Sequence, residues 1–279
     1  MTLPPHDPSS PPSPAAQVEW GRPSSAPQGG GDDLDPAGPA RTPGSGPVPG
    51  SDLGADLGAA LSFAGRALLW NPVTYLVSGL IYCVVSLLIV GGGVVGGFFA
   101  MFAFLGGPDV SDSDELAGML AFYGVFLVAM LLLMPFALLW QSGAARAAGI
   151  VREGGPPSIT QAMVGPMRVV LTALLYGAIV LLGTLLLYLP GLIAAALFLF
   201  AIPAALRGAT PVAAMKESLA LVKENLGTAI VSYLVLMVIT SIASTIVIPL
   251  LVLTPFLMLF QLGLYERLNG RRLPEPATV

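Results

Sequence analysis

Four uncharged stretches, each long enough to cross a membrane, dominate this chain. They cover residues 67–108, 116–145, 169–206 and 225–265 of the 279-residue sequence. A helix crosses a bilayer core with about 20 apolar residues, so each stretch exceeds one crossing. Only 10% of the residues are charged, whereas about a quarter are charged in ordinary soluble domains. The sequence therefore predicts an all-α multipass membrane protein.

Breaks within these stretches divide them into six predicted spans. An acidic loop at residues 109–115 separates the first two spans, and a Leu-Pro-Gly turn signal interrupts the third stretch at residues 189–191. The fourth stretch would be roughly 60 Å long as one helix, about twice the bilayer core, so it must fold back at 248–249 or 254–255. The predicted spans are approximately 72–99, 117–141, 168–188, 191–207, 226–247 and 249–266. They form a helical bundle of three hairpins, of which the second or third could instead be re-entrant.

The distribution of basic residues predicts an orientation for these hairpins. Beyond residue 50, all ten lysines and arginines fall at the hairpin bases and none at the tips. Lysine and arginine concentrate in cytoplasmic loops of membrane proteins. We therefore expect both termini in the cytoplasm and the acidic 109–115 loop outside.

The first 50 residues differ in composition from the rest of the chain. They hold 13 of the 26 prolines and 8 of the 33 glycines, with few large apolar side chains. Such a segment cannot offset the entropy of ordering the chain. We expect a disordered cytoplasmic tail over 1–50, a membrane domain over 51–270 and a short C-terminal tail over 271–279. Most Pro-rich tails are linkers or solubilising extensions, but this one could also bind a protein partner through an aromatic groove.

An amphipathic segment precedes each predicted hairpin. Before the first, apolar residues recur at helical spacing from Leu53 to Leu68, while Asp52, Asp56 and Arg66 take other positions. Ser158 and Gln161 have capping-box spacing before the second hairpin, and a helix that begins at Thr210-Pro211 precedes the third. Helices of this kind can lie among lipid headgroups, and the candidate headgroup contacts are Arg66, Arg168, Lys216 and Lys223. The alternative is that these interfacial helices only cover the cytoplasmic ends of the spans.

The first and third hairpins also share residues at a constant offset of 154. The matching pairs are Asn71 with Asn225, Thr74 with Thr228, Val77 with Val231, and Ser78 with Ser232. In the second hairpin, Thr172 and Gly177 fall in the places of Thr74 and Gly79. Topology and charge follow the same period, so we expect an internal repeat of three units.

The segment 211–225, PVAAMKESLALVKEN, lies immediately before a predicted span. Together with the segment 63–71 and the apolar hairpins, it resembles a set of uncharacterised bacterial multipass membrane proteins. That set includes the membrane domain associated with some glycerophosphoryl diester phosphodiesterases. The resemblance covers roughly residues 55–270 and implies a bacterial cytoplasmic membrane location. It carries over no catalytic residue, because the phosphodiesterase chemistry of those relatives lies in a separate soluble domain.

Side chains for catalysis or metal binding are scarce. The single cysteine, Cys83, lies inside an apolar stretch, and the single histidine, His6, lies in the Pro-rich tail. His-centred catalytic and zinc sites are therefore excluded. The acidic cluster of Asp109, Asp112, Asp114 and Glu115 lacks the spacing of a calcium loop, so we interpret it as a solvated loop tip. We expect no catalytic residue, no cofactor and no metal.

Glycines in the first span predict close helix packing. Gly92 with Gly96, and Gly93 with Gly97, form two small-xxx-small pairs that let another helix approach. We expect them to pack helices within the chain, with homodimerisation as the alternative. The stretch is not a phosphate-binding loop, because no Lys and Ser or Thr accompany its glycines.

These features favour a non-enzymatic membrane protein that serves as a scaffold or lipid-interacting component of the cell envelope. Membrane lipid is its expected partner, and no nucleic-acid partner is expected. The six spans contain no ionisable side chain away from their ends, which argues against proton-coupled pumping. The alternative is a facilitator or transporter subunit for an apolar or zwitterionic solute. Its pathway would use the hydroxyl groups of Thr240, Ser241, Ser244 and Thr245.

Overall fold

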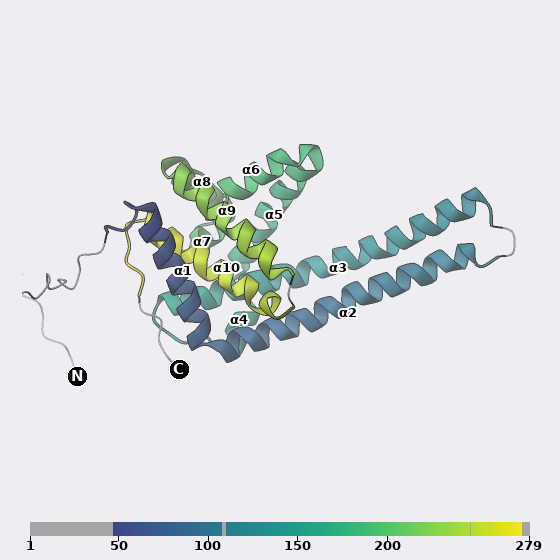
Figure 1. The fold of residues 1–279 in the computed structure, drawn as a ribbon, viewed down its shortest axis with the longest axis horizontal. Helices are drawn as coiled ribbons and strands as arrows, with labels where there is room; N and C mark the ends of the chain where they lie inside the picture. Colours follow the sequence, from purple (N-terminus) through teal and green to yellow (C-terminus); the bar gives the residue numbers. More distant parts are fainter. Residues whose placement is uncertain (1–46, 108–109, 246, 275–279) are drawn as a thin grey trace, which may run out of the picture. The chain divides into compact units, whose positions relative to one another are not determined.

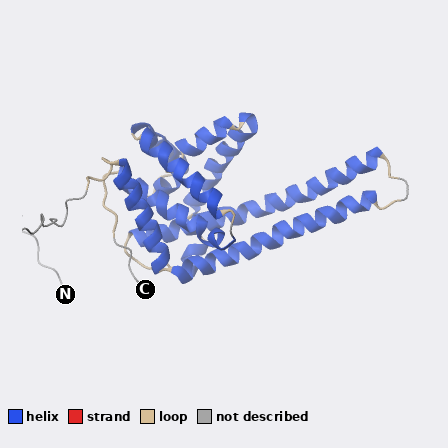
Figure 2. Cartoon of the chain, viewed as in Figure 1, coloured by secondary structure: helices blue, strands red, loops and turns tan. Residues whose placement is uncertain are grey.

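The computed structural model describes residues 47–107, 110–245 and 247–274, and every regular element in these ranges is a helix (Figures 1 and 2). The helices are α1 (Leu53–Trp70), α2 (Pro72–Leu105), α3 (Asp112–Arg152), α4 (Ile159–Met163), α5 (Met167–Leu187), α6 (Leu189–Leu197), α7 (Ala201–Leu206), α8 (Pro211–Glu224), α9 (Leu226–Ala243) and α10 (Val247–Leu268). They belong to one structural unit, Gly46–Val279. Most of the predicted tail, residues 1–46, lies outside the described ranges.

Six helical segments are long and apolar enough to cross a membrane. They are Pro72–Leu105, Asp112–Arg152, Ile159–Leu187, Leu189–Leu206, Leu226–Ala243 and Pro249–Leu268. Large apolar side chains such as Leu87, Phe99, Leu120 and Leu131 are exposed along α2 and α3. Exposed apolar surface of this extent is typical of a membrane-facing surface. The prediction of an all-α protein with six candidate spans is confirmed.

The breaks between helices were predicted from proline positions. The structure confirms one of these breaks and contradicts another. The break near residue 189 is confirmed, because Tyr188 has a positive φ of 59° and Pro190 lies in the first turn of α6. The last break lies between Ala243, where α9 ends, and Val247, where α10 begins, so it precedes the predicted site at 248–249, and Pro249 lies in the first turn of α10. The alternative break at 254–255 is wrong, because Pro255 lies inside α10.

The segment predicted as the fourth span is interrupted. Phe198–Phe200 form turns between α6 and α7, which leaves backbone groups without helical partners. Ser218 of α8 supplies partners there: its Oγ donates to the Leu197 carbonyl and accepts from the Phe200 N–H, both at 3.0 Å. Ser218 is fully buried. The α8 helix therefore holds the α6–α7 break in place.

Two helix junctions have the same geometry in the first and third predicted units. Asn71 connects α1 to α2 with φ −126° and ψ 49°, and Asn225 connects α8 to α9 with φ −128° and ψ 43°. Each side-chain amide donates to the carbonyl four residues earlier, Ala67 at 3.1 Å and Leu221 at 3.0 Å. Residues matched only by sequence offset thus share a conformation. The second unit differs, since the capping box of Ser158 and Gln161 begins a helix of only five residues.

The apolar face of α1 packs against α10 and not against an open surface. Ala60 and Phe63 contact the position of Gly263, and the fully buried side chains of α10 include Leu259 and Leu262. Asp56, which lies off the apolar stripe of α1, is nevertheless shielded from solvent. Asp56 is buried, where it accepts a hydrogen bond from Arg267 Nε at 2.7 Å and from the Gly50 N–H. The arginine lies 211 residues later in the chain, so helical spacing alone could not reveal the partner.

Candidate functional site

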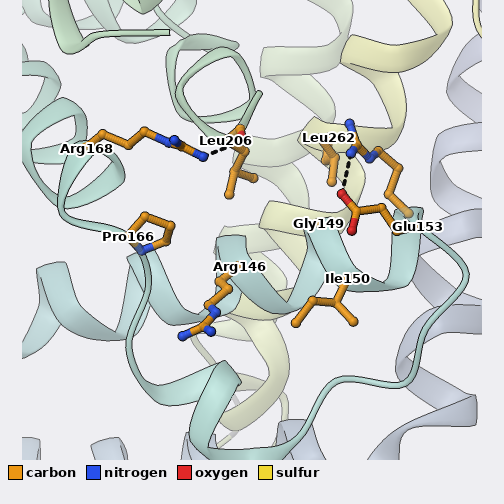
Figure 3. Close-up of a pocket in the computed structure, with 9 residues that line it drawn as sticks. Arg146, Gly149, Ile150, Glu153, Pro166, Arg168, Leu206 and Leu262 are labelled. Atoms are coloured by element: carbon orange, nitrogen blue, oxygen red, sulfur yellow. Dashed lines mark hydrogen bonds and ion pairs between the residues drawn. The ribbon is translucent and has the colours of Figure 1, made fainter. Parts of the chain in front are cut away.

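A basic pocket lies where the end of α3, the start of α5, the end of α7 and α10 meet (Figure 3). Its volume is about 160 Å³. The lining residues are Arg146, Gly149, Ile150, Arg152, Glu153, Pro166, Arg168, Leu206 and Leu262. Three arginines and one glutamate therefore line the same cavity. We call this cavity the arginine pocket.

A close contact between α3 and the start of α5 positions two of the arginines. The backbone at Gly165 lies against the Ser142 carbonyl group, and the Gly165 N–H donates to Ser142 Oγ at 3.2 Å. Gly143 lies equally close to the backbone of Ala162. A side chain at either glycine would overlap backbone atoms, so both positions require glycine. This contact brings Arg146, one turn further along α3, beside the first turn of α5, which carries Arg168.

Arg146 and Arg168 differ from the other arginines of the pocket region in their partners. Arg146 Nη1 donates to the Val164 carbonyl at 3.2 Å. Arg168 Nη2 donates to the Leu206 carbonyl at 3.3 Å, as Figure 3 shows. Within the described ranges neither guanidinium has a carboxylate within ion-pair distance. Each guanidinium has five N–H donors. The pair can therefore donate further hydrogen bonds to an anion.

The third arginine of the pocket is neutralised. Arg152 binds Glu153 at 2.8 Å and Glu266 at 3.2 Å. Glu266 also lies 3.6 Å from Arg207 and 3.2 Å from Arg271. The Glu266 side chain is only 4% exposed. One buried carboxylate thus connects the C-terminal ends of α3, α7 and α10, and through Arg152 it contacts a residue that lines the arginine pocket.

The other predicted headgroup residues do not line this pocket. All three are exposed: Arg66 on α1, and Lys216 and Lys223 on α8. Within the described ranges these side chains form neither an ion pair nor a side-chain hydrogen bond. Of the four predicted residues, only Arg168 lies in the arginine pocket. Arg146 was missed as a candidate, although its position at the end of an uncharged stretch marks it as a residue of a hairpin base.

The predicted packing glycines fall into two groups. A methyl group at Gly97 would lie 2.8 Å from the Phe122 ring, and one at Gly93 would overlap the Ala129 side chain, so both positions contact α3 closely. Gly96 lies in ordinary contact distance of Val125, and Gly92 has open space beside it. The close contacts therefore occur between α2 and α3 within the chain, which run side by side in Figure 1.

The remaining candidate residues form no metal site in the part of the chain described here. No group of three His, Cys, Asp or Glu side chains is placed to hold an ion there. Cys83 is a half-buried free thiol in α2. Asp114 completes a capping box with Ser111 at the start of α3, so this part of the acidic cluster caps a helix. His6 and Asp109 lie outside the described ranges.

Comparison with known proteins adds no functional assignment. No family model, curated protein or solved structure matches the chain. The resemblance based on residues 211–225 therefore stays a prediction. Function has to be argued from the chemistry of the site.

Proposed function

We propose that this chain is a non-enzymatic, lipid-interacting protein of the bacterial plasma membrane that binds anionic lipid headgroups in the arginine pocket. The observation that carries this proposal is the pair Arg146 and Arg168, two guanidiniums that line one cavity and form no ion pair with a carboxylate in the described part of the chain. Guanidinium groups bind phosphate oxygens through charge-assisted, often bidentate hydrogen bonds. A phosphate in the pocket could accept hydrogen bonds from the N–H groups that each guanidinium has left.

The position of the pocket along the helices agrees with a headgroup ligand. Arg146 follows an uncharged stretch of 30 residues and Arg168 immediately precedes one of 38. Both arginines therefore lie at the boundary of segments that are apolar enough to enter a bilayer. In the proposed orientation, three hairpins extend from this cytoplasmic boundary, and both termini lie on the same side. The apolar face of α1 is covered by α10, so protein packing, and not lipid, is the main role of that helix.

We expect replacement of both arginines by glutamine to weaken binding of anionic lipid. Basic residues near a membrane surface contribute about 1 kcal/mol each, so the Arg146→Gln/Arg168→Gln variant should bind phosphatidylglycerol roughly 30-fold less tightly. The measurement is native mass spectrometry of the purified full chain after incubation with liposomes of phosphatidylglycerol and phosphatidylcholine. Retention by the unmodified chain should also fall as ionic strength rises.

The matched control removes the same charge elsewhere. Lys216→Gln/Lys223→Gln deletes two exposed cations from α8, outside the arginine pocket. If both double variants lose phosphatidylglycerol equally, the interaction depends on net charge and a specific pocket is ruled out. Free inorganic phosphate, added at increasing concentration, separates a lipid site from a phosphate site. A site that phosphate fills as tightly as the lipid would contradict lipid binding.

The Pro-rich segment suggests a second, compatible role as a scaffold. A protein partner would bind there through an aromatic groove. Affinity purification from native membranes tests this role by comparing the full chain with a chain that lacks residues 1–50. A protein that is enriched only with the full chain would assign the scaffold function to that segment. Equal retention of lipid and no protein by both chains would leave lipid binding as the function.

The facilitator alternative has one observation in its favour. Thr240 and Ser241, two of the hydroxyl residues singled out for a solute pathway, line a cavity between helices. Their neighbours Ser244 and Thr245 bond instead to nearby backbone carbonyls. Uptake of uncharged and zwitterionic solutes into liposomes that contain the purified chain tests this candidate. Uptake at the rate of protein-free liposomes would exclude it for the solutes used.

A further inference from the structure

A second cavity, of about 290 Å³, lies among α5, α9, α10 and the break between α6 and α7. Its lining residues are Tyr176, Leu199, Tyr233, Leu236, Met237, Thr240, Ser241, Leu257 and Gln261. The lining residues on α5, α9 and α10 lie seven to fifteen residues from the helix ends at Met167, Leu226 and Leu268, which corresponds to depths of about 10–23 Å along the helices. We call this cavity the hydroxyl cavity. In a membrane it lies within the hydrocarbon region.

Five polar side chains meet in the hydroxyl cavity without hydrogen-bond partners in the described protein. They are Tyr176, Tyr233, Thr240, Ser241 and Gln261. Threonine and serine in helices often bond to the carbonyl four residues earlier, as Thr172 and Ser232 do here. Thr240 and Ser241 do not, so their hydroxyls remain free to bind another group. Unpartnered polar groups are costly in hydrocarbon, and their convergence on one cavity indicates a polar ligand.

The chemistry of the lining excludes a charged ligand. No acidic or basic side chain lines the hydroxyl cavity. Its tyrosine, threonine and serine hydroxyls both donate and accept hydrogen bonds, and the Gln261 amide adds two donors and an acceptor. A buried ion would need an opposite charge. The groups therefore match an uncharged molecule with hydroxyls of its own.

The size and exposure of the hydroxyl cavity favour a lipid headgroup. At about 290 Å³, the hydroxyl cavity lies at the lower limit of the roughly 300–1,000 Å³ of pockets that bind small molecules. That space accommodates a glycerol-sized group but not two acyl chains. Met237, Thr240 and Ser241 are exposed on α9, the helix that would border the acyl chains. A lipid could insert its head between the helices and keep its chains in the bilayer.

We propose that the hydroxyl cavity binds the hydroxyl-bearing headgroup of an uncharged glycerolipid of the diacylglycerol class. The site is separate from the arginine pocket, and the two share no lining residue. The proposal rests on the membrane location of the chain but not on anionic lipid binding. The hydroxyl cavity would thus bind uncharged headgroups, whereas the arginine pocket would bind anionic ones.

The test measures binding of a labelled short-chain diacylglycerol to the full chain in phosphatidylcholine nanodiscs. Tyr176→Phe/Tyr233→Phe removes two hydroxyls and keeps both rings, so the fold should persist. We expect this variant to bind diacylglycerol about tenfold less tightly or worse. Tyr188→Phe is the matched control, because Tyr188 is an exposed tyrosine at the α5–α6 turn outside the cavity. It should bind as the unmodified chain does.

Two further ligands test whether the cavity recognises the free hydroxyl of the lipid or any small molecule that carries hydroxyl groups. Diacylglycerol with its free hydroxyl methylated should bind as weakly to the unmodified chain as diacylglycerol binds to the double variant. Free glycerol that binds as tightly as the lipid would overturn the lipid assignment. Equal diacylglycerol binding by the unmodified chain and both variants would overturn the site itself. Phosphatidylglycerol binding is measured on the same samples. It reports on the arginine pocket alone, so the proposal for the hydroxyl cavity and the proposal for the arginine pocket can be rejected independently.

Discussion

Replacing Glu266 with glutamine should lower the free energy of unfolding by about 3 kcal/mol, because it removes a buried charge on which three arginines converge. The carboxylate lies 3.2 Å from Arg152, 3.6 Å from Arg207 and 3.2 Å from Arg271. Breaking a buried ion pair by removing one partner typically costs about 3–5 kcal/mol. The lower end applies here, since the three arginine side chains are 22%, 29% and 47% exposed and keep some hydration.

Glu153→Gln provides the matched control for this prediction. Glu153 pairs with the same Arg152 at 2.8 Å, but its side chain is 69% exposed. Exposed pairs contribute about 0–1 kcal/mol, so this variant should unfold almost as the unmodified chain does. The measurement is unfolding of the purified full chain in mixed micelles with increasing SDS, followed by helical circular dichroism. Equal unfolding midpoints for Glu266→Gln and Glu153→Gln would show that Glu266 does not hold the helix ends together.

The Glu266 cluster also bears on the arginine pocket. Arg152 belongs to both, so loss of the buried carboxylate would release one more guanidinium toward the cavity. The same substitution should then weaken the fold and strengthen attraction for an anion. Because Glu266 joins the ends of α3, α7 and α10 through three arginines, binding of an anion at Arg152 would be coupled to the packing of these helices.

Features that depend on one segment were predictable from the sequence. Hydropathy located the six candidate spans, and the capping box at Ser158 is present as expected. The equivalence of Asn71 and Asn225 followed from a constant offset, and both amides bond to the preceding turn. Caps and apolar runs depend on residues a few positions apart, so periodicity and spacing report them directly.

Features that join distant segments were not predictable in the same way. The pairing of Asp56 with Arg267 connects the first and last helices, and the arginine pocket collects residues from four. Helical periodicity places an acidic residue on one face but cannot say which helix covers that face. Arg168 was predicted from its position at the boundary of an uncharged stretch. Arg146 was missed, because the two residues share a pocket only through the close backbone contacts that Gly143 and Gly165 make between α3 and the segment before α5.

Pro255 is an instance in which a local rule gave the wrong answer for a physical reason. A break at 254–255 was one of the two alternatives predicted for the last uncharged stretch, but α10 continues through Pro255. Pro255 has no N–H to donate to the Leu251 carbonyl, which leaves that oxygen without its helical partner. Gly79 of α2 packs directly against this carbonyl group. A close Cα–H contact is a weak substitute for a hydrogen bond, and it shields the carbonyl from hydrocarbon.

Substitution of Gly79 by alanine should therefore destabilise the protein by about 2–3 kcal/mol. The added methyl group would lie 2.8 Å from the Leu251 carbonyl carbon and closer still to its oxygen. Backbone atoms cannot rotate away as a side chain can, so α2 and α10 would have to separate. Separation would also expose the unpaired carbonyl that Gly79 covers.

Gly177→Ala is the control that the internal repeat supplies. Gly177 takes the place of Gly79 in the second predicted unit, but no described atom outside the backbone of its own helix turn lies within 4 Å of a methyl group added there. Alanine in an open helical position should stabilise the protein by about 0.5–1 kcal/mol, because glycine loses more backbone freedom on folding. Unfolding in SDS should therefore shift in opposite directions for the two variants. A shift of the same sign at both positions would mean that helix propensity governs Gly79, and that α2 does not need to approach the carbonyl freed by Pro255.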